Sequence, residues 1–132
     1  MKRIIVLFII FTCSVFGAEI NWVKDYNAAL TEAKNSSKSI FMVVEKEDCF
    51  FCGVYKEKTL SLSTVAKFIN ENYIPLKVMQ DDGSYPSDKF NVIGTPTTFF
   101  IDKDGNKYIS PLVGYANKYK LMKKLEQGLF TK

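Results

Sequence analysis

Cys49 and Cys52 are the residues of this chain whose type and spacing are best suited to chemistry. Two residues separate them, and a segment that we expect to be helical follows, so both can lie on its first turn and form a disulfide. The free amide groups and the dipole at a helix N-terminus stabilise negative charge, which favours the thiolate that attacks disulfides. The first cysteine of such a pair is the more exposed one. We therefore predict that Cys49 is the nucleophile and Cys52 the resolving thiol.

Residues 1–17 have the features of an export signal, because two basic residues are followed by an unbroken apolar run and a permissive cleavage site. We expect Ala18 to begin the mature chain, so that the folded domain covers residues 18–132. A retained membrane anchor is one alternative, although residues 4–16 are fewer than the about 20 that a spanning helix needs. A lipoprotein acylated on Cys13 is another. A periplasmic or secreted location means an oxidising compartment, where disulfides persist.

Three other interpretations of the cysteine pair compete with exchange chemistry. Zinc needs four ligands, and the sequence has no histidine and no second cysteine pair, so we expect no metal site. A purely structural disulfide between Cys49 and Cys52 would close a very small loop and remove little entropy from the unfolded chain. A pair of inert buried thiols fits poorly with an exported protein.

Composition indicates one globular domain whose net charge is small. The chain has 132 residues, of which 47% are hydrophobic and 14% aromatic, enough for a single packed core. The formal net charge is +4, and part of it belongs to the N-terminal basic residues. This weak and mixed balance gives no reason to expect nucleic acid or an anionic membrane as a partner.

Apolar periodicity predicts alternating helices and strands in the mature chain. Asp25 is expected to cap the first helix and Ser63 a later one, and Pro75 marks a strand start or a sheet edge. An Asp-Gly turn at 104–105 predicts a β-hairpin. The expected helices are 25–34, 50–58, 63–70 and 117–130, and the expected strands are 39–44, 73–79, 97–101 and 107–113. This order predicts an α/β fold, a mixed central sheet with helices on both faces.

The pair Cys49-Phe50-Phe51-Cys52 follows an expected strand, and Gly94-Thr95-Pro96-Thr97 begins another. These motifs resemble those of the thioredoxin-like family, and the leading helix with Lys38-Ser39-Ile40-Phe41 resembles its exported members. The segment 113–118 resembles the one that leads into the family's last helix. The resemblance covers about residues 25–130 and implies a thioredoxin fold with a Cys49–Cys52 disulfide. It also implies a cis Thr95–Pro96 bond facing the cysteines, and a substrate groove formed by Phe50, Phe51, Thr95, Pro96 and Gly114.

One position departs from the family pattern. Members usually bury a carboxylate six residues before the first cysteine, where this chain has Val43. The buried lysine that accompanies it corresponds to Lys77. Glu45 is two residues beyond Val43 and faces the same side of a strand, so it is a candidate proton acceptor. A surface Glu45 and a site without any carboxylate are the alternatives.

The expected function is exchange of dithiol and disulfide with exported proteins, with a reductant as the favoured direction. Phe50-Phe51 places no cation between the cysteines, which favours a reductase or an isomerase over a strong oxidant. A reductant would need electrons from another carrier, for which a membrane thiol carrier is the candidate partner, and no cofactor is expected. The alternatives are a disulfide oxidase or isomerase, and a non-catalytic protein-binding module. One of the two phenylalanines is expected to pack inward and the other to form an apolar docking patch.

Overall fold

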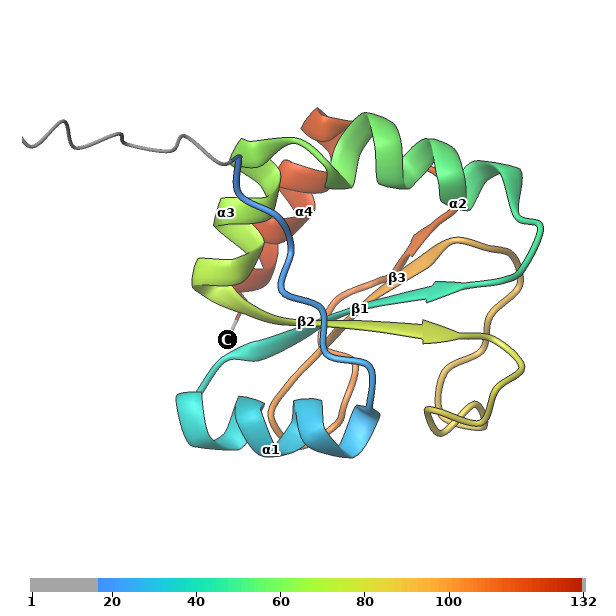
Figure 1. Cartoon of the computed structure of the whole chain (residues 1–132). Helices are drawn as coiled ribbons and strands as arrows, with labels where there is room; N and C mark the ends of the chain where they lie inside the picture. Colours follow the sequence, from blue (N-terminus) through green and yellow to red (C-terminus); the bar gives the residue numbers. More distant parts are fainter. Residues whose placement is uncertain (1–16, 132) are drawn as a thin grey trace, which may run out of the picture.

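A four-stranded mixed sheet organises the chain in the computed structural model, which describes residues 17–131 (Figure 1). The strand order is β2-β1-β3-β4. β1 (Ser39–Glu45) is parallel to β2 (Tyr73–Met79) and antiparallel to β3 (Thr97–Ile101), and β3 pairs antiparallel with β4 (Leu112–Val113). β1 and β3 are therefore central, which agrees with their burial, since every residue of β3 and all of β1 except Glu45 are buried.

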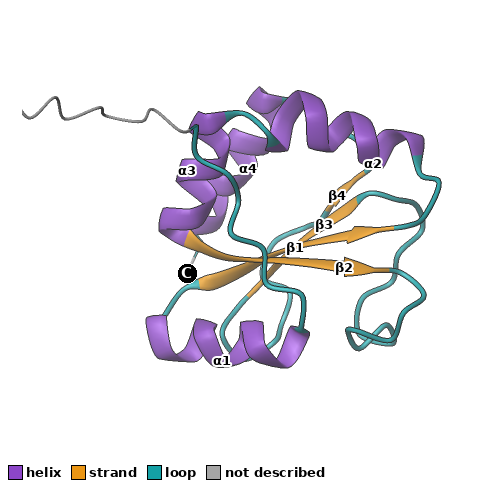
Figure 2. Cartoon of the chain, in the orientation of Figure 1, coloured by secondary structure: helices purple, strands orange, loops and turns teal. Residues whose placement is uncertain are grey.

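Helices cover both faces of this sheet (Figure 2). α1 (Tyr26–Ser36) lies on one face. The other face carries α2 (Phe50–Tyr55), a π-helical turn η1 (Lys56–Leu60), α3 (Ser63–Asn72) and α4 (Lys118–Phe130). The predicted mixed sheet with helices on both faces is confirmed. No helix within residues 17–131 is long and apolar enough to span a membrane.

Two hydrophobic cores lie on opposite faces of the sheet, and β1 contributes to both. Ile40, Met42 and Val44 pack toward α1, whereas Phe41 and Val43 pack toward the helices of the other face. All five side chains are fully buried. Burying one such side chain contributes about 1.5–3 kcal/mol, so the strand that leads to the cysteines is firmly fixed.

Most expected boundaries agree with the structure, and the exceptions have local causes. Asp25 caps α1 as predicted, since its carboxylate accepts the Ala28 amide hydrogen bond at 2.8 Å. The prediction that Ser63 caps α3 is wrong, because the N-cap is Leu62 and no side chain caps this helix. The expected antiparallel return after the Asp104-Gly105 turn is confirmed, because Lys107 forms an antiparallel bridge with Ile101 and β4 pairs antiparallel with β3. The predicted bounds 107–113 are too long, since β4 is only Leu112–Val113 and Pro111, which has no amide hydrogen, precedes it.

Pro75 occupies an edge strand, as predicted, because β2 is the first strand of the sheet. Its carbonyl accepts from the Val23 amide at 2.8 Å, and the Lys77 amide donates to the Val23 carbonyl at 3.0 Å. The segment before α1 thus lies along the outer side of β2. The predicted signal peptide lies outside the described residues except for Gly17, so its cleavage before Ala18 stays a prediction.

Candidate active site

The two cysteines lie where β1 gives way to α2. A short link of three residues follows Glu45, and Cys49 is the N-cap residue of α2. Cys49 and Cys52 form a disulfide with their Cα atoms 5.3 Å apart. Cys49 is half-buried, whereas Cys52 is only 6% exposed. The predicted difference in exposure between the two cysteines is therefore present.

Two hydrogen-bond donors converge on the sulfur of Cys49. The Cys52 amide donates to it at 3.2 Å, and the Thr95 hydroxyl donates to it at 3.3 Å. The Thr95 carbonyl oxygen is 3.6 Å away. Donors aimed at a sulfur stabilise it as a thiolate more than as a thiol. The loop before β3 thus provides a polar group directly at the more exposed sulfur.

The peptide bond between Thr95 and Pro96 is cis, the geometry that the family resemblance implies. Pro96 is buried, and its carbonyl accepts from the Gly114 amide at 2.7 Å. Gly114 has a φ of 80°, a left-handed conformation that favours glycine. The structure therefore brings the cysteine pair, the Thr95–Pro96 bond and Gly114 together, as the sequence predicted.

Four apolar side chains are exposed around these groups, and we call them the apolar rim. Phe50 is 76% exposed, Phe51 56%, Ile93 78% and Tyr115 36%. The prediction that one phenylalanine packs inward is wrong. The two rings contact each other edge to face, with centroids 5.4 Å apart, at the surface end of α2. An exposed apolar cluster of this kind is typical of a binding surface.

Two buried hydrogen bonds fix α2 and η1 to the rest of the site. The Tyr55 hydroxyl lies 3.1 Å from the hydroxyl of Thr98 in β3, and the Thr59 hydroxyl donates to the Ala116 carbonyl at 2.7 Å. Burial raises the pKa of Tyr55, so its phenol stays protonated and has no role as a base. These contacts hold the helix that carries the cysteines at a fixed position against β3 and the loop beyond β4.

Glu45 and Lys77 form an ion pair behind the cysteines. The Glu45 carboxylate oxygen Oε1 lies 3.8 Å from Lys77 Nζ, and their side chains are 17% and 25% exposed. Val43, at the position of the family's usual carboxylate, is fully buried among apolar side chains. Glu45 also lines an open pocket of about 510 Å³ with both cysteines. The remaining residues of this pocket are Lys46, Asp48, Phe50, Gly53 and Lys56.

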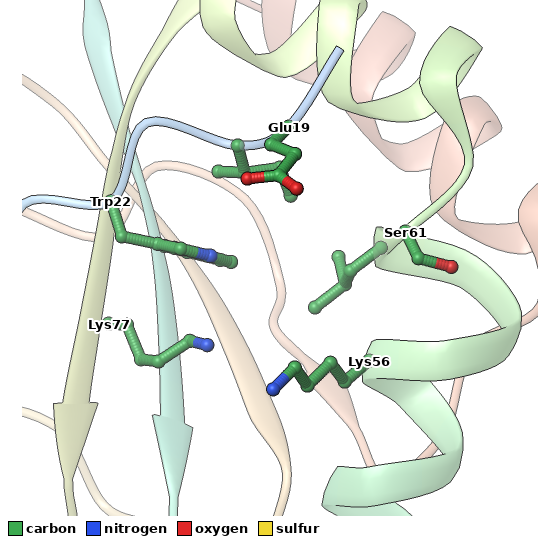
Figure 3. Close-up of a pocket in the computed structure, with 7 residues that line it drawn as sticks. Glu19, Trp22, Lys56, Ser61 and Lys77 are labelled. Carbon is green, nitrogen blue, oxygen red and sulfur yellow. The ribbon is translucent and has the colours of Figure 1, made fainter. Parts of the chain in front are cut away.

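A second pocket, of about 430 Å³, lies between η1 and β2 on the same face of the sheet. Figure 3 shows the side chains of Lys56 and Lys77 extending toward each other across it, with the Trp22 indole beside Lys77. Lys56 lines both pockets. The ion pair of Glu45 and Lys77 therefore connects the pocket at the cysteines with the pocket behind them.

Sequence reasoning missed three contributors to the site. The Thr95 hydroxyl was expected to border the groove, not to contact the sulfur of Cys49. Tyr55 and Trp22 were not considered at all. The spacing of Tyr55, three residues after Cys52 on one helix face, was the available signal. No pattern in the sequence pairs Trp22 with Lys77, since the two are far apart along the chain.

Comparisons with known proteins agree with this geometry. Residues 26–129 match the thioredoxin-like domain family. Anterior gradient protein 3 of Xenopus tropicalis is 27% identical over 95 residues, 66% of this chain and 52% of that protein. Across the curated relatives that it matches, the chain spans about half of their length or less.

Two solved structures illustrate the shared fold. A DsbH oxidoreductase has a TM-score of 0.71 at 20% identity, with 92% of each chain covered. A putative disulphide-isomerase from Bacteroides thetaiotaomicron has a TM-score of 0.71 at 24% identity, covering 88% of this chain and 96% of that one. The fold is therefore the thioredoxin fold.

A thioredoxin fold with a Cys49–Cys52 disulfide at the start of α2 defines a thiol:disulfide oxidoreductase domain. The chain belongs to the thioredoxin-like family, because the family match covers most of its length.

Proposed function

We propose that the protein reduces disulfide bonds of exported proteins, with Cys49 as nucleophile and Cys52 as resolving thiol. The observation that carries this proposal is the environment of Cys49, a half-exposed sulfur that two donors contact beside the cis Thr95–Pro96 bond. The Cys49 thiolate attacks a substrate disulfide, forms a mixed disulfide and releases one substrate thiolate. Cys52 then loses its proton and attacks the Cys49 sulfur. The second substrate thiolate leaves and takes up a proton, and the protein is left with its Cys49–Cys52 disulfide.

The charges around the pair support a reductant over a strong oxidant. A strong oxidant needs a reduced form in which the thiolate is strongly stabilised. The pocket at the cysteines is lined by the carboxylates of Glu45 and Asp48 and by the ammonium groups of Lys46 and Lys56, so its formal charges cancel. The two residues between the cysteines are uncharged. The thiolate is favoured by the N-terminus of α2, whose Cys52 amide donates to the Cys49 sulfur, and by the Thr95 hydroxyl. Together these groups provide a modest stabilisation.

Glu45 is the group that we assign as proton acceptor for Cys52. Both line the same open pocket, and Cys52 is only 6% exposed. Lys77 holds the carboxylate at this pocket by an ion pair, since its Nζ lies 3.8 Å from Glu45 Oε1. Proton transfer to Glu45 produces the Cys52 thiolate for the resolving step. Solvent then recovers the proton through the open pocket.

The apolar rim supports protein substrates. Phe50 and Phe51 flank the nucleophile on one side, while Ile93 and Tyr115 belong to the loops that carry the cis-proline and Gly114. An extended polypeptide with apolar residues near its disulfide would bury these rings. The N-terminal sequence supports the periplasm or the exterior as the place of this reaction, with a membrane thiol carrier as the source of electrons.

Reduction of insulin by the mature protein, driven by a chemical dithiol, tests the proposal. Wild type is expected to accelerate the reaction and Cys49→Ser to abolish the acceleration. A reduction potential close to that of thioredoxin, about −270 mV, is expected, whereas a value near −120 mV would indicate an oxidase. Absence of turnover in wild type together with retained binding of apolar peptides would identify a binding module instead. N-terminal sequencing of exported protein is expected to begin at Ala18.

A further inference from the structure

A short segment before α1 lies across the outer side of β2, and we call residues 19–23 the N-terminal strap (Figure 1). Its backbone pairs with β2 on both sides of Val23, including a bond from the Lys77 amide. Asn70 of α3 fixes its beginning, because the Asn70 side chain donates to the Glu19 carbonyl at 2.7 Å and accepts from the Asn21 amide at 2.9 Å. The strap is thus attached to the domain at two separate places.

Trp22 is the strap side chain that reaches the ion pair behind the cysteines. Its indole stacks on Phe41 of the core, with ring centroids 6.2 Å apart. Lys77 Nζ lies 4.7 Å from the centroid of the Trp22 ring, which is a cation–π contact. The same nitrogen lies 3.8 Å from the Glu45 carboxylate. The ammonium group is therefore held by an aromatic face and a carboxylate together.

The Lys77 side chain also borders a second pocket, into which its ammonium group could turn. The pocket of about 430 Å³ behind η1 begins at Lys77, and its only other ammonium group among the described residues is that of Lys56 (Figure 3). A lysine side chain has several rotatable bonds, and its ammonium group prefers water to a half-buried pair unless a contact retains it. The Trp22 face provides that contact. Without it, the ammonium group can turn from Glu45 into the solvent of this pocket.

We propose that Trp22 is a positioning residue for proton transfer, which acts by holding Lys77 against Glu45. This inference rests on the proposed role of Glu45 as acceptor of the Cys52 proton. The charged groups that face Glu45 are Lys77 from β2, Lys46 and Asp48 from the link after β1, and Lys56 from η1. Because Lys46 and Asp48 carry opposite charges, Lys77 and Lys56 provide the net positive field at this carboxylate.

The positive charge of Lys77 decides in which direction loss of Trp22 moves the pH–rate profile. An ammonium group beside a carboxylate favours the ionised form, which is the form that accepts a proton. Loss of the Trp22 face releases Lys77 from its position 3.8 Å from the Glu45 carboxylate and weakens this interaction. A cation–π contact of ordinary strength corresponds to a shift of about 0.3 to 1 pH unit. The acid limb of the pH–rate profile for disulfide reduction should move upward by that amount.

The experiment compares the pH–rate profiles of insulin reduction for wild type, Trp22→Leu and Trp22→Phe. Leucine retains apolar bulk without an aromatic face, and we expect the full upward shift. Phenylalanine retains a weaker face, and we expect a smaller shift. Lys77→Met should shift the acid limb at least as far, and adding Trp22→Leu to it should produce no further shift, because the two residues act through one contact. Lys67→Met is the matched control, since Lys67 pairs with Glu71 on an exposed helix face and its profile should match wild type.

The outcomes separate this inference from the proposed function. If wild type does not reduce insulin, the proposed function fails. If wild type is active and Glu45→Gln removes the acid limb while Trp22→Leu superimposes on wild type, only the role of Trp22 is overturned. If Trp22→Leu does not fold, Asn70→Ala loosens the strap instead, and the single tryptophan of the chain reports its release by fluorescence. A released strap with an unchanged profile also overturns the inference.

Discussion

Replacing Thr95 by valine isolates one of the two donors at the nucleophilic sulfur. Valine has nearly the shape of threonine and lacks its hydroxyl, so the backbone before the cis-proline and the packing around it are preserved. The hydrogen bond that is lost runs from the Thr95 hydroxyl to the Cys49 sulfur at 3.3 Å. The amide bond from Cys52 remains. Thr95→Ser is the matched control, because serine retains the hydroxyl.

The size of the change in Cys49 thiolate formation follows from the strength of a hydrogen bond to a charged sulfur. Hydrogen bonds to charged groups contribute about 1.5–3 kcal/mol. Sulfur accepts less strongly than oxygen and the site is half exposed, so we take about 1 kcal/mol for the Cys49 thiolate. This free energy corresponds to about 0.7 of a pH unit in thiolate formation. At a pH below the midpoint, the Thr95→Val protein should therefore hold about fivefold less Cys49 thiolate than wild type.

The assay follows the reduced protein. Ultraviolet absorbance of the thiolate and the rate of alkylation by iodoacetamide are measured across the pH range for wild type, Thr95→Val and Thr95→Ser. The midpoint for Thr95→Val should lie about 0.7 of a pH unit above wild type, and Thr95→Ser should lie close to wild type. Superimposed curves for wild type and Thr95→Val would refute the argument that this hydroxyl stabilises the nucleophile. A shift of equal size in Thr95→Ser would assign the effect to packing.

Three further predictions concern exchange, recognition and stability. Cys52→Ser should accumulate reductant-sensitive mixed disulfides with partner proteins, visible on non-reducing gels, whereas a protein with Cys49→Ser should form none and have no turnover. Phe51→Ser should raise KM for insulin about fivefold, the equivalent of about 1 kcal/mol of lost apolar burial, and affect a small disulfide substrate less. Gly128→Ala should lower the free energy of unfolding in urea by about 1–2 kcal/mol, because its Cβ would meet the hydroxyl of buried Tyr73, and this exceeds the gain in helix propensity.

The sheet was predictable from sequence wherever burial is complete. β1 and β3 are buried on both faces. β1 accordingly has an apolar run over residues 40–44 and β3 has only threonine and apolar residues, so their boundaries could be placed closely. The region after Ile101 was not predictable in this way. Its pairing with β3 is limited to a single bridge at Lys107 and the two residues of β4. The predicted strand also included residues 108–111, where Pro111 lacks an amide hydrogen and cannot donate to a neighbouring strand.

The candidate site was predictable to the extent that its members are neighbours in sequence or belong to a known motif. The cysteine pair, Pro96 and Gly114 meet these conditions. For the two phenylalanines between the cysteines, the sequence predicted one exposed ring and one buried ring. Periodicity on a six-residue helix is too short to decide which rings are buried. Both rings are exposed, since Cys52 and Tyr55 already occupy the inward face of α2.

The chain has Val43 where the family usually has a carboxylate, and its candidate carboxylate is Glu45 instead. This change explains why Trp22 of the N-terminal strap matters to the site. Val43 and Glu45 point to the same face of β1, and Val43 is enclosed by the apolar core, where a charged group would be costly. Glu45, at the end of the strand, reaches the open pocket at the cysteines and remains partly exposed. The Lys77 ammonium group holds this carboxylate from 3.8 Å away, and the Trp22 ring in turn lies against that ammonium group. The placement of Lys77, and hence the aromatic face that retains it, is therefore part of the proposed proton transfer.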